Sequence, residues 1–128
     1  MSFLLDTNVL LWVASNPQRI PSKIMAELLD LDTPNYFSVI SIWEVAIKSA
    51  LNKPDFQYDA VQLRLGLLTN RWEELNFTGD HAAAVTTLPM LHRDPFDRAL
   101  IAQAISEGLT LITSDEKMGA YGAMVRVV

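Results

Sequence analysis

The sequence predicts an α/β fold in which helices cover both faces of a central parallel sheet, and two observations lead to this class. Short β-rich segments alternate along the chain with longer segments of helical pattern, which is the order of elements in α/β domains. The short segments are mostly continuous apolar runs, which is typical of strands buried on both faces. Right-handed crossovers between parallel strands then place helices on each side of the sheet.

The expected elements follow one another with short connections. Strands are expected at about 3–5, 36–39, 72–75, 109–112 and 124–128. Helices are expected at about 7–14, 22–31, 41–51, 59–69, 78–87 and 94–107. The last helix begins with Asp94-Pro95 and is closed by Gly108, which are typical start and stop signals. Apolar alternation at 61–65 also suits a strand, and 52–59 indicates a loop between helices.

Composition narrows the functional classes. The 128 residues fit a single domain, 1–128, and half of them are apolar, which is enough for a core. The chain has no cysteine, which excludes disulfides, thiolate zinc sites and cysteine nucleophiles. It begins without the basic segment of a signal peptide, and no apolar run reaches the roughly 18 residues that span a membrane. We therefore expect a soluble cytoplasmic protein.

The net charge of −5 argues against a general nucleic-acid binder, which is normally basic. It does not exclude a nuclease that holds cations in an acidic pocket, because bound metal would neutralise several of the 15 acids.

Three acids follow expected strands closely. Asp6 comes directly after the first strand, Glu44 follows the second by about one helical turn, and Asp115 comes just after the 109–112 strand. Carboxyl ends of parallel strands share one edge of the sheet, where ligands bind. Asp97 lies in the first turn of the helix that precedes the 109–112 strand, and its spacing alone does not bring it to this edge.

Each acid also has a structural interpretation. Asp6 and Asp94 have the position of helix caps, and Glu44 forms a capping-box pattern with Ser41. Asp115 suits an ordinary turn. Together, however, clustered carboxylates are the ligands of Mg²⁺ or Mn²⁺, which relieve their mutual repulsion. Such an ion activates water for attack at phosphorus.

Four motifs, in this order and spacing, support a more specific interpretation. "LLDTNVLLW", "SIWEVAIK", "HRDPFDRALIAQA" and "LITSD" span residues 4–115 and resemble the PIN-domain ribonucleases, specifically the VapC-type toxins of type II toxin–antitoxin pairs. The resemblance implies a three-layer α/β/α sandwich, cleavage of RNA, a homodimer and an antitoxin partner. It also implies that the helix beginning with "DPFD" brings its acid to the site.

Motif matching assigns the candidate residues. The metal-binding and catalytic acids are Asp6, Glu44, Asp97 and Asp115. Residues beside them that can orient ligands or water are Thr7, Asn8 and Ser114. Asp94 lies within a motif but is not one of its four acids.

Basic and aromatic residues near the motifs have two interpretations each. Arg93, Arg98 and Lys48 can bind a substrate phosphate, but Arg98 and Lys48 also lie four residues after acids and suit helical ion pairs. His92 is expected in a surface or structural role, because metal-bound hydroxide needs no histidine base. Trp43 can stack on a base, and burial in the core or in an interface is the alternative.

Two other functional classes compete with the nuclease. A phosphoryl-transfer protein on a similar sheet usually carries a second acid two residues after the first, where this chain has Asn8. A non-catalytic partner-binding module would use the acids only as caps.

Overall fold

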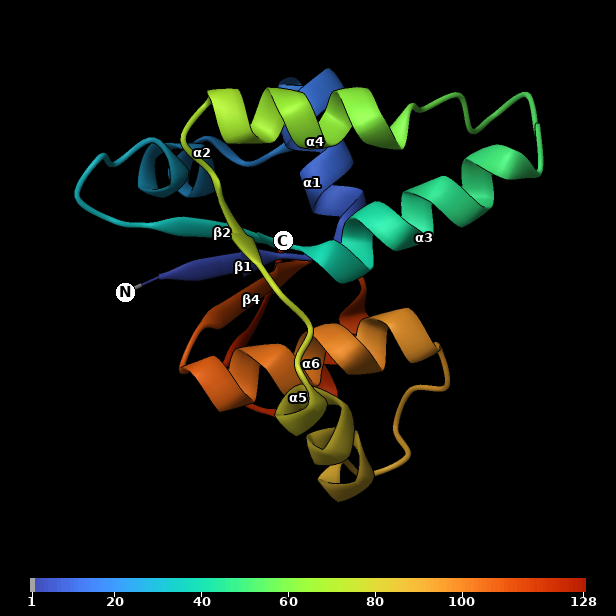
Figure 1. Ribbon diagram of the computed structural model, residues 1–128. Helices are drawn as coiled ribbons and strands as arrows, with labels where there is room; N and C mark the ends of the chain where they lie inside the picture. Colours follow the sequence, from blue (N-terminus) through green and yellow to red (C-terminus); the bar gives the residue numbers. More distant parts are fainter. Residues whose placement is uncertain (1) are drawn as a thin grey trace.

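The computed structural model describes residues 2–128, which form three layers, helix on sheet on helix, as predicted (Figure 1). Within this part of the chain the sheet has five strands, all parallel, in the order β3-β2-β1-β4-β5. The strands are β1 (Phe3–Leu5), β2 (Asn35–Ser38), β3 (Glu73–Leu75), β4 (Thr110–Thr113) and β5 (Val125–Val127). The strand order reverses direction between β1 and β4, at the centre of the sheet.

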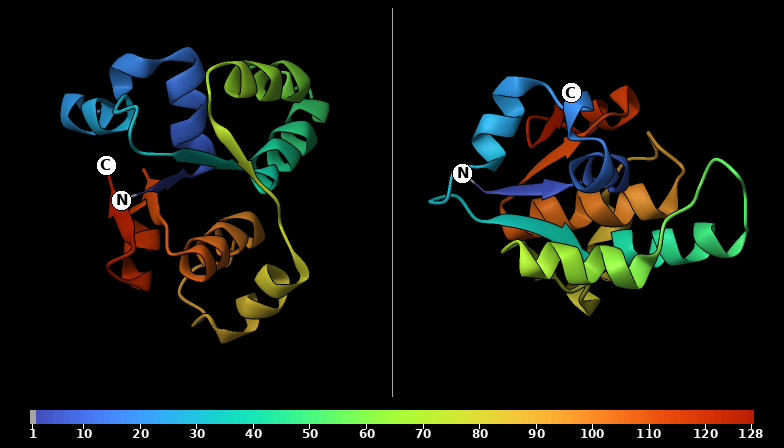
Figure 2. Two further views of the ribbon diagram at one scale, coloured as in Figure 1. Left: turned by 60° about the vertical axis from the view of Figure 1, so that its left-hand side comes forward. Right: turned by 90° about the horizontal axis from the view of Figure 1, so that it is seen from above.

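Helices cover both faces of the sheet. They are α1 (Thr7–Ser15), α2 (Ser22–Leu28), α3 (Val39–Ala50), α4 (Ala60–Thr69), α5 (Gly79–Ala84) and α6 (Pro95–Glu107). Three short 3-10 turns join them: η1 (Pro17–Arg19), η2 (Val85–Thr87) and η3 (Glu116–Tyr121). Figures 1 and 2 show α1, α2 and α4 on one face and α5 and α6 on the other, with α3 starting at the carboxyl edge of β2.

The alternation of side chains along β1 divides the core into two layers. Phe3 and Leu5 pack with residues of α1, α2 and α4, whereas Leu4 packs with Leu100 and Ile101 of α6 on the opposite face. All of these side chains are buried. Burial on both faces explains the continuous apolar run of β1.

The start of α3 corrects one expectation. Ser38 is its cap, with its hydroxyl oxygen accepting from the Ile40 amide at 3.0 Å, and the helix begins at Val39 rather than at residue 41. Ser41 therefore lies inside the helix, and the capping box that we expected between Ser41 and Glu44 is wrong. Both side chains are instead buried and turned toward α1.

Two helix predictions are confirmed in detail. The 60–69 segment is helical rather than extended, because Asp59 accepts from the Val61 and Gln62 amides and caps it. Asp94 caps α6 by accepting from the Phe96 and Asp97 amides at 2.8 and 3.2 Å.

Smaller differences affect the other ends. The helix expected over 22–31 ends at Leu28, and the one expected over 78–87 ends at Ala84 and continues as the turn η2. None of the helices in residues 2–128 combines the length and the apolar character that crossing a bilayer requires.

Candidate active site

The candidate site lies at the carboxyl edge of the sheet, next to β1 and β4, where the strand order reverses and where parallel sheets commonly bind ligands. Asp6 follows β1 and Asp115 follows β4, while Glu44 comes from α3. Helix α6 begins at this same edge and runs back toward the start of β4, so its first turn carries Asp97 to the other acids (Figure 1).

Asp6 combines a structural and a site role. Asp6 is only 4% exposed. Its Oδ1 accepts a hydrogen bond from the Val9 amide at 2.9 Å, which caps α1. Oδ2 accepts from the Thr113 hydroxyl. Burial raises the pKa of Asp6 above its usual value, although the hydrogen bonds from Thr113, Val9 and Ser114 oppose this shift. Capping and site membership are therefore not alternatives for this residue.

Thr113 is a site residue that the sequence interpretation missed. Its hydroxyl donates to Asp6 and accepts from the Asp115 amide at 3.0 Å, so one side chain links two of the acids. Ser114, which we expected to support the site, contributes a backbone hydrogen bond to Asp6. The sequence does contain a feature that could have identified Thr113. It is a hydroxyl side chain at the last position of an apolar strand, on the edge of the sheet where the acids lie.

Glu44 is held by two neighbours. It is 5% exposed, and Oε1 accepts from the Thr7 hydroxyl at 2.7 Å, while Oε2 accepts from the Lys48 ammonium at 2.5 Å. Partial burial lowers the pKa of Lys48, but its bond to Glu44 and the charges of Asp94 and Asp97 outweigh this and raise the pKa overall. Lys48 thus forms the helical ion pair and also faces the acid site.

Asp97, Asp115 and His92 converge. His92 Nε2 lies 2.8 Å from Asp97 Oδ2 and 3.2 Å from Asp115 Oδ2, and each of the three residues offers one ligand atom within 4.8 Å of the others. The His92 side chain is only 14% exposed. We expected a surface or structural role for this histidine, and the structure places it among the acids instead.

The charge of the site is under-neutralised. The pKa of Asp97 is raised to about 7, first by burial and then by the nearby charges of Asp94, Glu44 and Asp6, with His92 opposing the shift. Carboxylates packed in this way repel one another unless a cation lies between them. The donor set of two carboxylates and an imidazole fits a divalent ion.

Arg98 corrects a further expectation. It is buried, and its guanidinium donates to the carbonyls of Val85, Pro89 and His92 and to the Tyr121 hydroxyl. These contacts engage the Arg98 guanidinium within the fold, and among the described residues it forms no ion pair with Asp94. Arg93, by contrast, is exposed.

Asn8 and Trp43 are both exposed. Among the first residues of α1 in the described chain, Thr7 rather than Asn8 contacts an acid. Trp43 is 58% exposed and packs edge-to-face on Phe96, with ring centroids 5.2 Å apart. Of the alternatives to base stacking for Trp43, burial in the core is therefore wrong, and burial in an interface stays a prediction.

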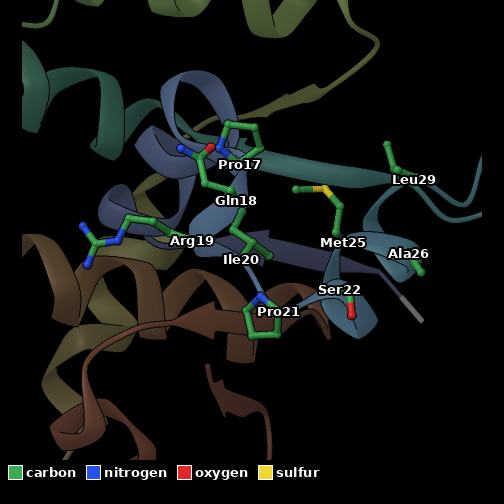
Figure 3. Close-up of a pocket in the computed structure, with 9 residues that line it drawn as sticks. All are labelled: Pro17, Gln18, Arg19, Ile20, Pro21, Ser22, Met25, Ala26 and Leu29. Atoms are coloured by element: carbon green, nitrogen blue, oxygen red, sulfur yellow. The ribbon is translucent and has the colours of Figure 1, made fainter.

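A surface depression lies elsewhere (Figure 3). Its walls come from η1, α2 and the residues between and after them, and none of the acids takes part. Arg19 at its rim lies over the Trp12 ring at 4.3 Å, a cation–π contact that accounts for its position. The depression is not the candidate active site.

Comparison with known proteins identifies the family. The PIN domain model matches residues 3–123. The chain belongs to the PIN domain family. No curated protein matches this PIN domain in sequence.

Solved structures share the fold of this PIN domain at low identity. One is VapBC2 from Rickettsia felis bound to a DNA fragment from its promoter, with 20% identity, coverage of 99% of this chain and 98% of that chain, and a TM-score of 0.73. A toxin–antitoxin complex from Klebsiella pneumoniae has 24% identity, covers 97% and 95%, and has a TM-score of 0.68. FitAcB from Neisseria gonorrhoeae has 24% identity, covers 96% and 95%, and has a TM-score of 0.63.

Proposed function

We propose that this PIN domain is a Mg²⁺- or Mn²⁺-dependent endoribonuclease that cleaves RNA phosphodiester bonds in the cytoplasm. PIN domains are generally nucleases, and the family is that of this chain. The observation that carries the proposal is the cluster of buried and partly buried acids at the sheet edge, in which the pKa of Asp97 is raised to about 7 by burial and by its acidic neighbours. Such a cluster is suited to a divalent cation and is unfavourable without one.

The side chains of the site have distinct proposed roles. Asp6, Glu44, Asp97 and Asp115 would hold the ion, which supplies an activated water and a positive charge opposite the phosphate. Thr7 and Thr113 orient Glu44 and Asp6 by hydrogen bonds. The half-exposed Lys48 ammonium, already beside the acids, is placed to attract a phosphate.

The competing interpretations account for fewer of these contacts. Helix capping explains the position of Asp94 and one of the contacts of Asp6 and of Asp115. Glu44, however, lies in the interior of α3 and caps no helix. A phosphoryl-transfer protein with a second acid two residues after Asp6 would need that position in the site, and Asn8 is exposed there.

We further propose that the enzyme acts as a toxin that an antitoxin neutralises. Several structures of the same fold are VapBC or other toxin–antitoxin complexes. Together with the motif resemblance, this supports an antitoxin as the physiological partner.

Removal of metal tests the enzymatic proposal directly. We expect the purified protein to cleave a mixed single-stranded RNA in millimolar Mg²⁺ or Mn²⁺, and EDTA to abolish the cleavage, because the acids alone cannot activate water. Gel analysis of the products, with a metal-restored sample as control, measures this. Cleavage that persists in EDTA, or no cleavage with either metal, would contradict the proposal.

We also propose a two-fold homodimer, the commonest oligomer symmetry. Apolar side chains are exposed around the end of α2 and along α4, with Leu31 86% exposed and Leu29, Val61 and Leu65 at least half exposed. Light scattering at micromolar concentration should give twice the mass of one chain, and Leu65→Lys should lower it. A single-chain mass for the parent protein would refute the dimer.

A further inference from the structure

The position of His92 carries an inference that rests on the proposed metal-dependent function and refines it. We propose that His92 Nε2 is itself a ligand of the metal, together with Asp97 and Asp115, and that the site therefore prefers a first-row transition ion such as Mn²⁺ over Mg²⁺. Carboxylate oxygens suit both ions, whereas an imidazole nitrogen favours transition metals.

The distances from His92 Nε2 to the two carboxylate oxygens fit neighbouring positions of one coordination sphere. Ligands at about 2.1 Å from an octahedral ion lie about 3.0 Å apart along each edge. His92 Nε2 lies 2.8 Å from Asp97 Oδ2 and 3.2 Å from Asp115 Oδ2, on either side of this value. The histidine therefore occupies the place of a neighbouring ligand to both carboxylates.

The direction of Nε2 is a second and independent observation. This atom is buried and makes no hydrogen bond, although both carboxylate oxygens are within reach. Neighbouring ligands of an octahedral ion lie about 45° away from the axis between nitrogen and metal, which is a poor direction for a hydrogen bond. A metal ligand is expected to look like this nitrogen: it lies close to two oxygens that are poorly oriented for hydrogen bonding, and its lone pair is free for the ion.

The backbone around His92 is held in place. Its amide donates to the Tyr121 hydroxyl at 2.9 Å, and its carbonyl accepts from Arg98 at 3.4 Å. The same Tyr121 and Arg98 also contact the Pro89 carbonyl. Outer residues of this kind orient the ligands of metal sites, so the buried Arg98 has a positioning role here.

The other ring nitrogen leaves the ligand form accessible. Binding through the Nε2 lone pair puts the ring proton on Nδ1. The Asp94 amide donates a long, weak hydrogen bond to Nδ1 at 3.5 Å, and this is the contact that the ligand form gives up. The required tautomer therefore breaks no strong contact.

Pulsed electron paramagnetic resonance of bound Mn²⁺ tests this assignment, because it detects a directly coordinated nitrogen without any enzymatic assay. The full chain is freed of metal, loaded with Mn²⁺ and compared with His92→Gln and Met90→Gln. Met90 is the matched control, since it is exposed on the same segment two residues away. We expect nitrogen coupling in the parent and in Met90→Gln and its loss in His92→Gln. Melting curves establish that each variant is folded.

Calorimetric titration with Mn²⁺ and with Mg²⁺ gives the preference. We expect the parent to bind Mn²⁺ at least about tenfold more tightly than Mg²⁺, and His92→Gln, which offers oxygen or nothing, to lose most of this ratio. Mn²⁺ bound without nitrogen coupling, an unchanged ratio in His92→Gln, or an equal loss in Met90→Gln would each overturn the inference. RNA cleavage without nitrogen coupling would refute His92 as a metal ligand but support the proposed nuclease activity. Nitrogen coupling without RNA cleavage would support His92 as a ligand but contradict the proposed nuclease activity.

Discussion

Asp97→Asn is expected to reduce metal-dependent RNA cleavage by at least about a hundredfold while the fold survives. Asparagine keeps the shape of the side chain but removes the charge that a divalent ion requires. Asp97 is the acid on which the other charges of the site converge, and its Oδ2 lies 2.8 Å from His92 Nε2. The measurement is the rate of cleavage of a mixed single-stranded RNA at saturating Mn²⁺ or Mg²⁺, with melting curves alongside.

Asp94→Asn is the internal control, because it changes the same chemical group three residues earlier. Asp94 accepts from two amides at the start of α6, and asparagine retains much of that capping ability. We expect this variant to keep most of its activity. Full activity in Asp97→Asn would defeat the assignment of Asp97, whatever the family suggests.

Asp97→Asn should also change how the stability of the metal-free protein depends on pH. The pKa of Asp97 is about 7 in the fold, above its ordinary value, so the fold takes up a proton before the unfolded chain does. Protonation of Asp97 therefore stabilises the metal-free parent increasingly as pH falls from about 7 toward 4. Asp97→Asn should melt higher than the parent above pH 7, and the difference should shrink toward pH 4.

The parallel sheet and its acidic edge could be predicted because they depend on local patterns. Apolar strands, helix caps and the positions of Asp6 and Asp115 directly after strands are all visible in the sequence. The position of Asp97 at this edge was harder to predict, because no strand comes just before it. The structure shows that a helix preceding a parallel strand begins at the carboxyl edge, so its first turn belongs to the same site.

The contacts of the remaining residues depend on packing between distant segments. Thr113 on β4 contacts Asp6 at the end of the neighbouring strand β1, and His92 contacts Asp115 from a segment that is held by hydrogen bonds with Tyr121 and Arg98. No spacing rule along the chain reports such contacts. Arg93 and Arg98 look equivalent in the sequence, yet one is exposed and the other is buried.

Arg98→Met is expected to lower the free energy of unfolding by about 2–4 kcal/mol, a fall in Tm of roughly 10 °C, because it removes the hydrogen bonds that the buried guanidinium donates to three carbonyls and a hydroxyl. Methionine fills a similar volume, so the loss reflects hydrogen bonds more than packing. Arg93→Met is the matched comparison on the same segment. Its side chain is exposed, and we expect a change of less than about 0.5 kcal/mol.

The two variants should also differ in how they affect the site. Arg98→Met releases the His92 carbonyl, so we expect weaker Mn²⁺ binding in the fraction that remains folded, whereas Arg93→Met should bind Mn²⁺ like the parent and lose affinity only for RNA. If Arg98→Met does not fold, Tyr121→Phe gives the same information more gently, since it removes only the hydroxyl that accepts from the His92 amide and donates to the Pro89 carbonyl. Calorimetry with Mn²⁺ and denaturant unfolding measure the two effects. Equal stability of Arg98→Met and Arg93→Met would show that the buried guanidinium does not hold this segment, and the positioning of His92 would then need another cause.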